Sequence, residues 1–342
     1  IGDLPLRKNE VSYFVNGSVP VSTVVPAEKS VTRSQPIHAF TVDVEDYFHV
    51  EAFANAIHRD TWPQLEYRCE RNVYRMLDML AERSVRGTFF VLGWVADRSP
   101  QLVKDIAAAG HEIACHGHSH QLVYRQTRQQ FADETRYAKG LLEDLTGTAV
   151  LGYRAASFSI TKVSMWALDT LIDLGFTYDS SVFPVRHHDN YGIPEAPLGP
   201  CRMRAPSGRT LIEVPLSVAD VAGLRVPVSG GGYFRLFPYW LSRAGMRHVE
   251  RKSGRPVVFY VHPWEIDVDQ PRVQAGLVSR LRHYNNISRC EARLKRAIPD
   301  GSRTDAADLR DEVMFKFNVM FARVGTNEDA TALDYYEVSF NQ

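Results

Sequence analysis

Residues 111–120 read HEIACHGHSH, in which a short apolar strand, residues 113–115, runs directly into a loop rich in imidazoles. His116 and His120 lie four residues apart, and a glycine between them allows the backbone to bend tightly. Neutral imidazole is the commonest protein ligand for zinc-like cations, and a catalytic cation takes two or three protein ligands while one position stays open. The stretch therefore predicts a metal site at the end of a strand, with His118 as a competing ligand.

The rest of the chain alternates between strand-like and helix-like segments. Buried or alternating apolar residues indicate strands, and apolar stripes with a helical period indicate helices. The predicted strands cover residues 38–44, 87–92, 111–115, 151–154, 176–179, 210–214 and 256–261. The predicted helices cover residues 70–84, 100–109, 127–145, 164–174 and 239–252. This order builds a parallel sheet with covering helices, and at this length it favours a closed or nearly closed (β/α) barrel.

Two segments flank the predicted barrel. Residues 1–35 have no helical period and contain short valine-rich pieces broken by prolines, so we expect a loosely structured arm with one edge strand at most. Residues 272–297 contain too few apolar side chains for an independent core. We therefore expect that segment to be a helix packed on the barrel rather than a second domain.

The composition is that of an ordinary globular protein. The 342 residues carry a formal net charge of zero, so no general attraction to nucleic acid or to an anionic membrane is expected. No run of about 18 apolar residues is present, which predicts no transmembrane helix. Four widely spaced cysteines without a CxxC pair fit a reducing compartment. Together with the lack of a visible signal sequence, they lead us to expect the cytoplasm rather than the periplasm.

Polar side chains stand where the predicted strands end, which is where barrels of this kind carry their functional groups. Each of these residues has an ordinary structural explanation when taken alone, such as a capping aspartate or a salt-bridged arginine. Their presence together at the same end of the predicted barrel is better explained by one functional site that they share. The residues are Asp43, Glu45, Asp46, His116, Arg154, Asp179 and His262.

Five motifs in order along this predicted barrel resemble those of a known family. They read TVDVEDYFHV (41–50), HGHSH (116–120), GYRA (152–155), YDSS (178–181) and YVHPWE (260–265). The chain resembles the polysaccharide deacetylases of the carbohydrate esterase 4, or NodB-homology, family. Within that family it resembles the subgroup that accompanies bacterial exopolysaccharide loci and carries a short C-terminal extension.

The resemblance covers residues 38–297 and implies both a fold and an activity. The implied fold is a distorted (β/α) barrel over residues 36–270, with an N-terminal arm (1–35) and a C-terminal extension packed on the barrel (271–342). The implied activity is metal-dependent removal of N-acetyl groups from an N-acetylhexosamine-containing glycan in exopolysaccharide biosynthesis. Zinc is the cation that we expect, with cobalt, manganese and nickel as alternatives.

The resemblance also implies roles for individual residues. Asp43 would be the general base, and Arg154 would pair with it and tune it. His262 would be the general acid that protonates the leaving amine. Asp179 would orient His262.

The metal ligands implied by the resemblance are His116, His120 and one carboxylate. Many family members have two adjacent aspartates in the first motif, whereas this chain reads Asp-Val-Glu-Asp. Strand alternation places Glu45 on the same face as Asp43 and favours it as the ligand. A bulge at the strand end would favour Asp46 instead.

Aromatic residues near the predicted loops fit a sugar substrate, because flat apolar sugar faces pack on rings. Filling of the core is the alternative explanation for several of them. The residues are Tyr47, Phe48, Trp94, Phe158, Phe183, Tyr233 and Trp264. Two other functions stay open at this point. One is a cyclic-amide hydrolase of the allantoinase-like branch, and the other is a non-catalytic glycan-binding module, which would be expected to lack the base or the acid.

Overall fold

The computed structural model describes residues 38–186, 192–298 and 336–338. The predicted N-terminal arm and most of the predicted C-terminal extension beyond Ile298 lie outside these residues.

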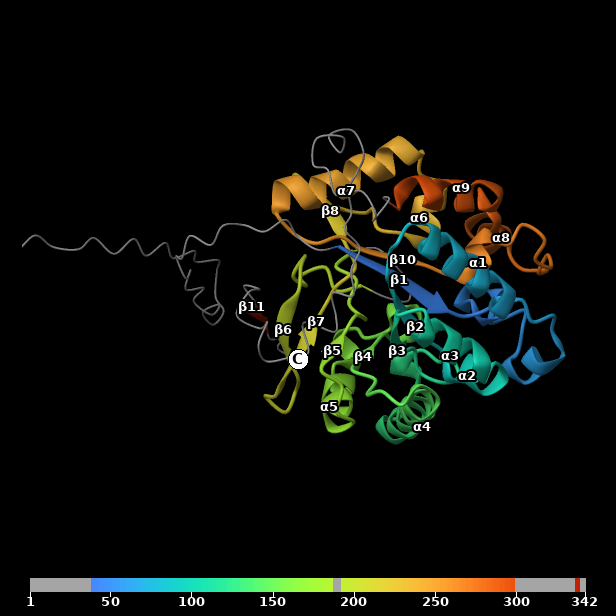
Figure 1. The fold of residues 1–342 in the computed structure, drawn as a ribbon. Coiled ribbons are helices and arrows are strands. Elements are labelled where there is room, and N and C mark those ends of the chain that lie inside the picture. Colours follow the sequence, from blue (N-terminus) through green and yellow to red (C-terminus); the bar gives the residue numbers. More distant parts are fainter. Residues whose placement is uncertain (1–37, 187–191, 299–335, 339–342) are drawn as a thin grey trace, which may run out of the picture. The chain divides into compact units, whose positions relative to one another are not determined.

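A nine-stranded sheet forms the centre of the described part of the chain (Figure 1). Its order is β10-β1-β2-β3-β4-β5-β7-β6-β11. All neighbours from β10 through β7 are parallel, β6 runs antiparallel to β7, and β11 is parallel to β6. The strands are β1 (Ala39–Val44), β2 (Thr88–Val91), β3 (Glu112–Cys115), β4 (Gly152–Tyr153), β5 (Tyr178–Asp179), β6 (Cys201–Arg204), β7 (Thr210–Glu213), β10 (Val258–Val261) and β11 (Tyr336–Val338). A separate hairpin pairs β8 (Val218–Val221) with β9 (Leu224–Pro227).

Helices surround the strands on the outside (Figure 1). They are α1 (Cys69–Glu82), α2 (Gly93–Arg98), α3 (Pro100–Ala108), α4 (Arg128–Thr146), α5 (Trp166–Asp173), α6 (Gly231–Leu236), α7 (Tyr239–Ser253), α8 (Leu277–Tyr284) and α9 (Ile287–Ala297). Sequence signals explain the ends of the longest one, since Thr127 caps α4 through the backbone of Gln130 and Gly147 ends it at φ +67°. Among the described helices, none is long and apolar enough to cross a membrane.

The central strands β1, β2 and β10 are buried on both faces, which is why their segments are rich in apolar residues. Phe40, Val42 and Val44 belong to the large core between the sheet and the helices. Ala39 belongs to a second core inside the curved sheet. Strand alternation places Asp43 on the face that Ala39 occupies, so the carboxylate points to the interior of the barrel.

The distorted (β/α) barrel predicted from the sequence is confirmed. No strand pair within the described residues closes the sheet, since its order begins at β10 and ends at β11. Strand β6 and the β8–β9 hairpin were not predicted. Their segments lack the apolar run of a doubly buried strand, and their outer residues are partly exposed.

The single helix predicted over residues 272–297 is wrong in one respect, because two helices, α8 and α9, occupy this region. Asn286 separates them with φ +51°, a left-handed conformation that asparagine tolerates better than most residues. In α9, Ile287, Cys290 and Leu294 are buried, and the last two belong to the large apolar core that also contains residues of β1.

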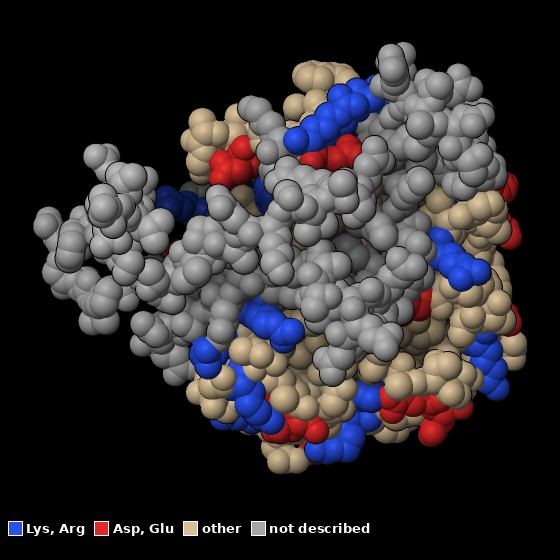
Figure 2. Space-filling model, turned by 60° about the vertical axis from the view of Figure 1, so that its left-hand side comes forward, with Lys and Arg blue, Asp and Glu red and all other residues tan. Residues whose placement is uncertain are grey.

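Charged side chains of both signs are interspersed over the described part of the face in Figure 2. Neither sign gathers into one large patch there, which agrees with the formal net charge of zero.

The packing of α9 leads to a stability prediction. Leu294 is fully buried, whereas Leu281 on α8 is 61% exposed. Leu294→Ala should lower the free energy of unfolding by about 2–5 kcal/mol, because it leaves a cavity in the core. Leu281→Ala is the matched control and should change that free energy by less than about 0.5 kcal/mol. Urea unfolding of both variants measures the difference, and equal effects would show that α9 is not part of the core.

Candidate active site

Five parallel strands deliver polar residues to one edge of the sheet. Asp43 lies at the end of β1, His116 directly follows β3, Arg154 follows β4 and His262 follows β10. Because the carboxyl ends of parallel strands meet at the same edge, these four side chains converge. The fifth strand, β5, ends at Asp179.

Glu45, His116 and His120 form a group in which one ligand atom from each residue lies within 4.8 Å of the others. All three are buried, and Nε2 of His120 lies 2.7 Å from Oε2 of Glu45. Nδ1 of His116 lies 2.8 Å from the carbonyl oxygen of Arg154. Since a carbonyl only accepts, Nδ1 carries the proton, and Nε2 keeps its lone pair for a cation.

The donor set fits a divalent cation. Two imidazoles and one carboxylate are a common three-ligand set for zinc, and they leave a position open for water or substrate. Nδ1 of His120 is buried without a hydrogen-bond partner, and Oε2 of Glu45 has no further partner beyond His120. Burial lowers the pKa of His116 to about 4, so this imidazole is neutral and able to ligate. His120 also has φ +52°, a strained conformation of the kind that occurs at functional sites.

The electrostatics of Glu45 also suit a ligand. Burial alone would raise the pKa of Glu45, but His120, His262 and His116 outweigh it and hold this pKa well below its usual range. Its other oxygen, Oε1, accepts the indole N–H of Trp264 at 3.1 Å. The Glu45 carboxylate is therefore ionised and held in place on both sides.

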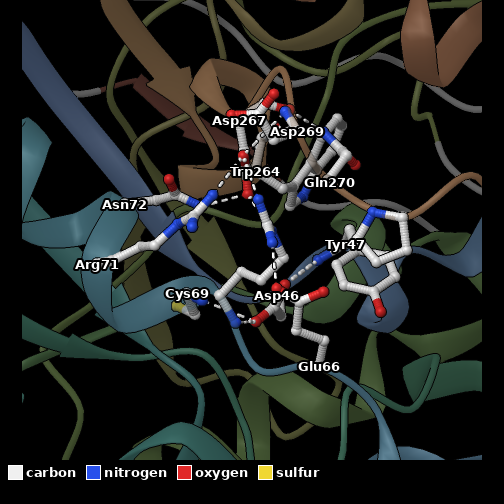
Figure 3. A network of polar contacts seen from close by, with 12 residues as sticks. Asp46, Tyr47, Glu66, Cys69, Arg71, Asn72, Trp264, Asp267, Asp269 and Gln270 are labelled. Atoms are coloured by element: carbon white, nitrogen blue, oxygen red, sulfur yellow. Dashed lines mark hydrogen bonds and ion pairs between the residues drawn. The ribbon is translucent and has the colours of Figure 1, made fainter.

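Asp46 does not belong to this group, so the alternative assignment of Asp46 as the metal carboxylate is not supported. Its carboxylate accepts three backbone N–H groups, from Tyr47 (2.8 Å), Arg68 (2.5 Å) and Cys69 (2.7 Å). Figure 3 shows the bonds to Tyr47 and Cys69. Asp46 thus anchors the first residue of α1 to the loop after β1, where a negative charge suits the N-terminus of the helix.

A second carboxylate completes this anchor. Asp267 accepts hydrogen bonds from Arg68 Nε (2.6 Å), Arg71 (2.9 Å) and Asn72 (3.0 Å) (Figure 3). The network joins the start of α1 to the loop that follows β10. It therefore ties the loop after β1 to the loop after β10, two strands that are already paired directly in the sheet.

Arg154 and Asp43 form a buried ion pair, with Nη1 of the arginine 2.6 Å from Oδ1 of the aspartate. The same guanidinium donates to Thr41 Oγ1 (2.8 Å) and to the carbonyl and hydroxyl oxygens of Ser180 (3.2 and 2.9 Å). The phenyl ring of Phe90 lies 4.0 Å from its central carbon. The pairing of Arg154 with Asp43 expected from the sequence is therefore present.

His262 has a different orienting partner from the one predicted. Its Nδ1 lies 2.8 Å from Oε1 of Glu265, three residues further along the chain. Burial opposes the charge on this imidazole, but the carboxylates of Glu45, Glu265 and Asp43 outweigh it and raise the pKa of His262 to about 9. Nε2 faces the centre of the site, 3.8 Å from Asp43 Oδ2 and 3.7 Å from Glu45 Oε1.

The prediction that Asp179 orients His262 is wrong. Its carboxylate accepts the hydroxyl of Ser181 at 2.5 Å and faces Glu213, its neighbour in register on β7. Burial raises the pKa values of both carboxyls, as expected for two acidic side chains that lie next to each other away from water. Asp179 therefore belongs to a structural pair beside Arg154.

Glu265, the actual partner of His262, was not predicted, although the sequence carries a local signal for it. The segment His-Pro-x-Glu places an acid at the third position of a turn that begins at the proline.

His118 does not compete for the cation either, since its Nε2 is paired with Asp97 at 3.0 Å, outside the metal group.

Most rings expected to stack on sugar are instead buried in the core. These are Tyr47, Phe48, Phe158, Phe183 and Trp264. Only Trp94 and Tyr233 are partly exposed.

A cleft of about 300 Å³ lies beside the metal group, lined by residues between Phe48 and Trp62. On its wall, Arg59 donates to the carbonyl oxygens of Ser119 (3.0 Å) and His120 (3.3 Å). The cleft is at the small end of the range for ligand sites. Its connection to the metal loop makes it a candidate for holding part of a substrate.

Comparison with known families agrees with this geometry. Residues 60–178 match the family described as polysaccharide deacetylase, and residues 180–309 match a domain of unknown function, DUF3473. The chain carries a polysaccharide deacetylase domain of the carbohydrate esterase 4 (NodB-homology) type. His116, His120 and Arg154 fall within the deacetylase match, whereas His262 and Glu265 fall within the DUF3473 match.

Individual relatives and one solved structure are similar to parts of this chain. A peptidoglycan deacetylase of Helicobacter pylori is 30% identical over 120 residues, which are 35% of this chain and 39% of that protein. A chitooligosaccharide deacetylase of Sinorhizobium fredii is 49% identical over 45 residues, or 13% of this chain and 21% of that one. The chain thus spans less than half the length of these relatives. A crystal structure of a candidate polysaccharide deacetylase from Mycobacterium smegmatis shares the fold, with a TM-score of 0.50, 22% identity and coverage of 77% of this chain and 86% of that one.

The geometry predicts which acidic residue of the first motif binds the cation. Glu45→Gln should weaken zinc binding by more than the roughly 10–100-fold typical of losing an outer-shell partner, because a ligand itself is neutralised. Asp46→Asn should keep zinc but unfold at a lower temperature, because it weakens acceptance of three backbone N–H groups. Zinc content after dialysis and thermal unfolding measure both effects. A zinc-free Asp46→Asn beside a fully loaded Glu45→Gln would reverse the assignment.

Proposed function

We propose that the protein is a metal-dependent hydrolase that removes acetyl groups from an N-acetylhexosamine-containing glycan. The observation that carries this proposal is that different residues around one centre can bind a cation, accept a proton and donate a proton. A three-residue cation site lies next to a carboxylate that is not part of it, Asp43, and to an imidazole on another strand, His262. Amide hydrolysis needs a nucleophile, a base and an acid, and this arrangement can supply all three.

Glu45, His116 and His120 would hold the cation. A divalent cation at such a site lowers the pKa of water towards about 7 and polarises a carbonyl group. Asp43 then accepts the proton of the attacking water, since Oδ1 is engaged with Arg154 while Oδ2 faces the site. The fixed guanidinium prevents the carboxylate from rotating away.

His262 acts on the other side of the reaction. The leaving group of an amide is a poor one unless its nitrogen is protonated as the C–N bond breaks. Nδ1–H is held by Glu265, so Nε2 is the nitrogen that delivers the proton. The neighbouring carboxylates raise the pKa of His262, which favours the protonated form that an acid requires. A positioned acid or base contributes about 10²–10⁴-fold to the rate.

The substrate class follows from the relatives and the cleft. The matched relatives are named as deacetylases of peptidoglycan and of chitooligosaccharides, which are both polymers of N-acetylated sugars. The cleft between Phe48 and Trp62 would take a sugar next to the one that reacts. We further propose zinc as the cation and bacterial exopolysaccharide biosynthesis as the setting, on the resemblance of the five motifs.

Acetate release from N-acetylglucosamine oligomers by the zinc-loaded protein tests the proposal. Asp43→Asn should bind zinc normally and lose about 10²–10⁴-fold in kcat, because the base is separate from the ligands. Thr41→Val is the matched control, since it also removes a buried partner of Arg154 but leaves the base in place.

Four results would contradict the proposal. Full activity after exhaustive removal of zinc would show that the reaction does not need the metal. Loss of zinc from Asp43→Asn would show that Asp43 is itself a metal ligand and not a separate base. Tight binding of the oligomers without acetate release would favour a glycan-binding module. Activity on cyclic amides alone would favour the allantoinase-like alternative.

A further inference from the structure

We propose that Arg235 is a positioning residue for the acid His262, and that the helix pair α8–α9 takes part in catalysis by holding Arg235 in place. This inference rests on the proposed deacetylase function. It assigns a catalytic contribution to the part of the chain that matches the domain of unknown function, residues 180–309.

Glu265 is the link between His262 and Arg235. One oxygen, Oε1, accepts from Nδ1 of His262 (2.8 Å) and from its backbone N–H (3.1 Å). The other oxygen, Oε2, accepts from Nε of Arg235 at 2.6 Å. Both oxygens are therefore used, and the carboxylate cannot turn without breaking one of these contacts.

The Glu265 carboxylate needs this partner because it is almost completely buried, with 1% of its surface exposed. Burial alone would raise its pKa, but Arg235 and His262 lower the pKa of Glu265 to about 2. A buried carboxylate without a cation beside it would take up a proton or move towards water. In either case it would hold the imidazole less well.

Arg235 is itself held by backbone atoms of the C-terminal helices. Its Nη1 donates to the carbonyl oxygens of His283 (2.6 Å) and Asn285 (2.9 Å), at the end of α8. In return, Asn286 donates to the backbone carbonyl of Arg235 at 2.8 Å. The guanidinium thus bridges the turn between α8 and α9 and the turn that follows β10.

The start of α6 adds to this rigidity. Gly230 has φ +128° and forms a bridge with Tyr260 on β10. A Cβ atom at position 230 would lie 1.9 Å from the carbonyl oxygen of Tyr260, so only glycine allows this approach. Helix α6, which carries Arg235, is therefore fixed directly against the strand that delivers His262.

The requirement for an acid differs between substrates, and this difference tests the proposal. The amide of an N-acetylated sugar needs a proton on its leaving nitrogen. The activated ester 4-nitrophenyl acetate does not, since 4-nitrophenolate leaves as the anion. Loss of the acid should slow the first reaction and spare the second, whereas misfolding or loss of zinc should slow both.

Zinc-loaded Arg235→Met should lose about 10²-fold or more in kcat on N-acetylglucosamine oligomers, with KM little changed and ester turnover within about threefold of the original protein. Arg235→Lys should recover part of the amide activity, because it restores the charge but cannot span Glu265 and the two carbonyls. Glu265→Gln keeps the side-chain volume and should show the same selective loss if Arg235→Met folds poorly.

Arg75→Met is the matched control. It removes another arginine–glutamate pair that ties α9 to the barrel, Arg75 to Glu291 at 2.7 Å, without touching Glu265. It should leave the ratio of amide to ester turnover unchanged. Equal loss of both activities in Arg235→Met and Glu265→Gln, or no loss in either, would overturn the proposal. An original protein that is inactive on the oligomers would instead overturn the deacetylase function, and the role of Arg235 with it.

Discussion

The contact between Arg154 and Asp43 is the constraint on which the arrangement of the site depends. A fully buried guanidinium joins the end of β1, through Thr41 and Asp43, to the residue after β5, through Ser180. The backbone carbonyl of Arg154 also fixes the proton on His116. One residue therefore sets the orientation of the base and the tautomer of a metal ligand.

Charge balance explains why the site tolerates so many buried ionisable groups. An isolated buried charge is costly, and an ion pair is tolerated only where its remaining hydrogen-bonding positions are satisfied. Asp43 is matched by Arg154, and Glu265 is matched by both His262 and Arg235. Glu45 lies next to two of the imidazoles. Each of these carboxylates has a cationic or ligating neighbour of its own. The base Asp43, the ligand Glu45 and the carboxylate of Glu265 that orients His262 therefore keep separate roles.

Much of the fold and part of the site could be predicted from the sequence. Hydrophobic periodicity located the parallel strands, and parallel strands bring their ends to one edge whatever the details of the loops. Strand alternation favours Glu45 over Asp46 as the metal carboxylate, and Glu45 is the one that lies beside His116 and His120 in the structure. The aromatic rings were harder to place, since a ring in a predicted loop packs into the core as readily as on a sugar.

Contacts that depend on tertiary structure could not be predicted. The family resemblance implies that Asp179 orients His262, yet the sheet places Asp179 opposite Glu213. Glu265 had a local signal in the turn after Pro263, whereas Arg235 had none. Its partners lie 30 to 50 positions away along the chain, and the packing of α6 against both β10 and α8 brings them together.

The most direct test of this account is an anomalous diffraction measurement on crystals grown with zinc. The account predicts one strong peak within about 2.0–2.2 Å of a Glu45 oxygen and of one nitrogen from each of His116 and His120. Asp43 and Asp46 should keep their contacts with Arg154 and with the start of α1. A peak bound to Asp46 or Asp43, or no peak at Glu45, would contradict the division between ligand, base and anchor.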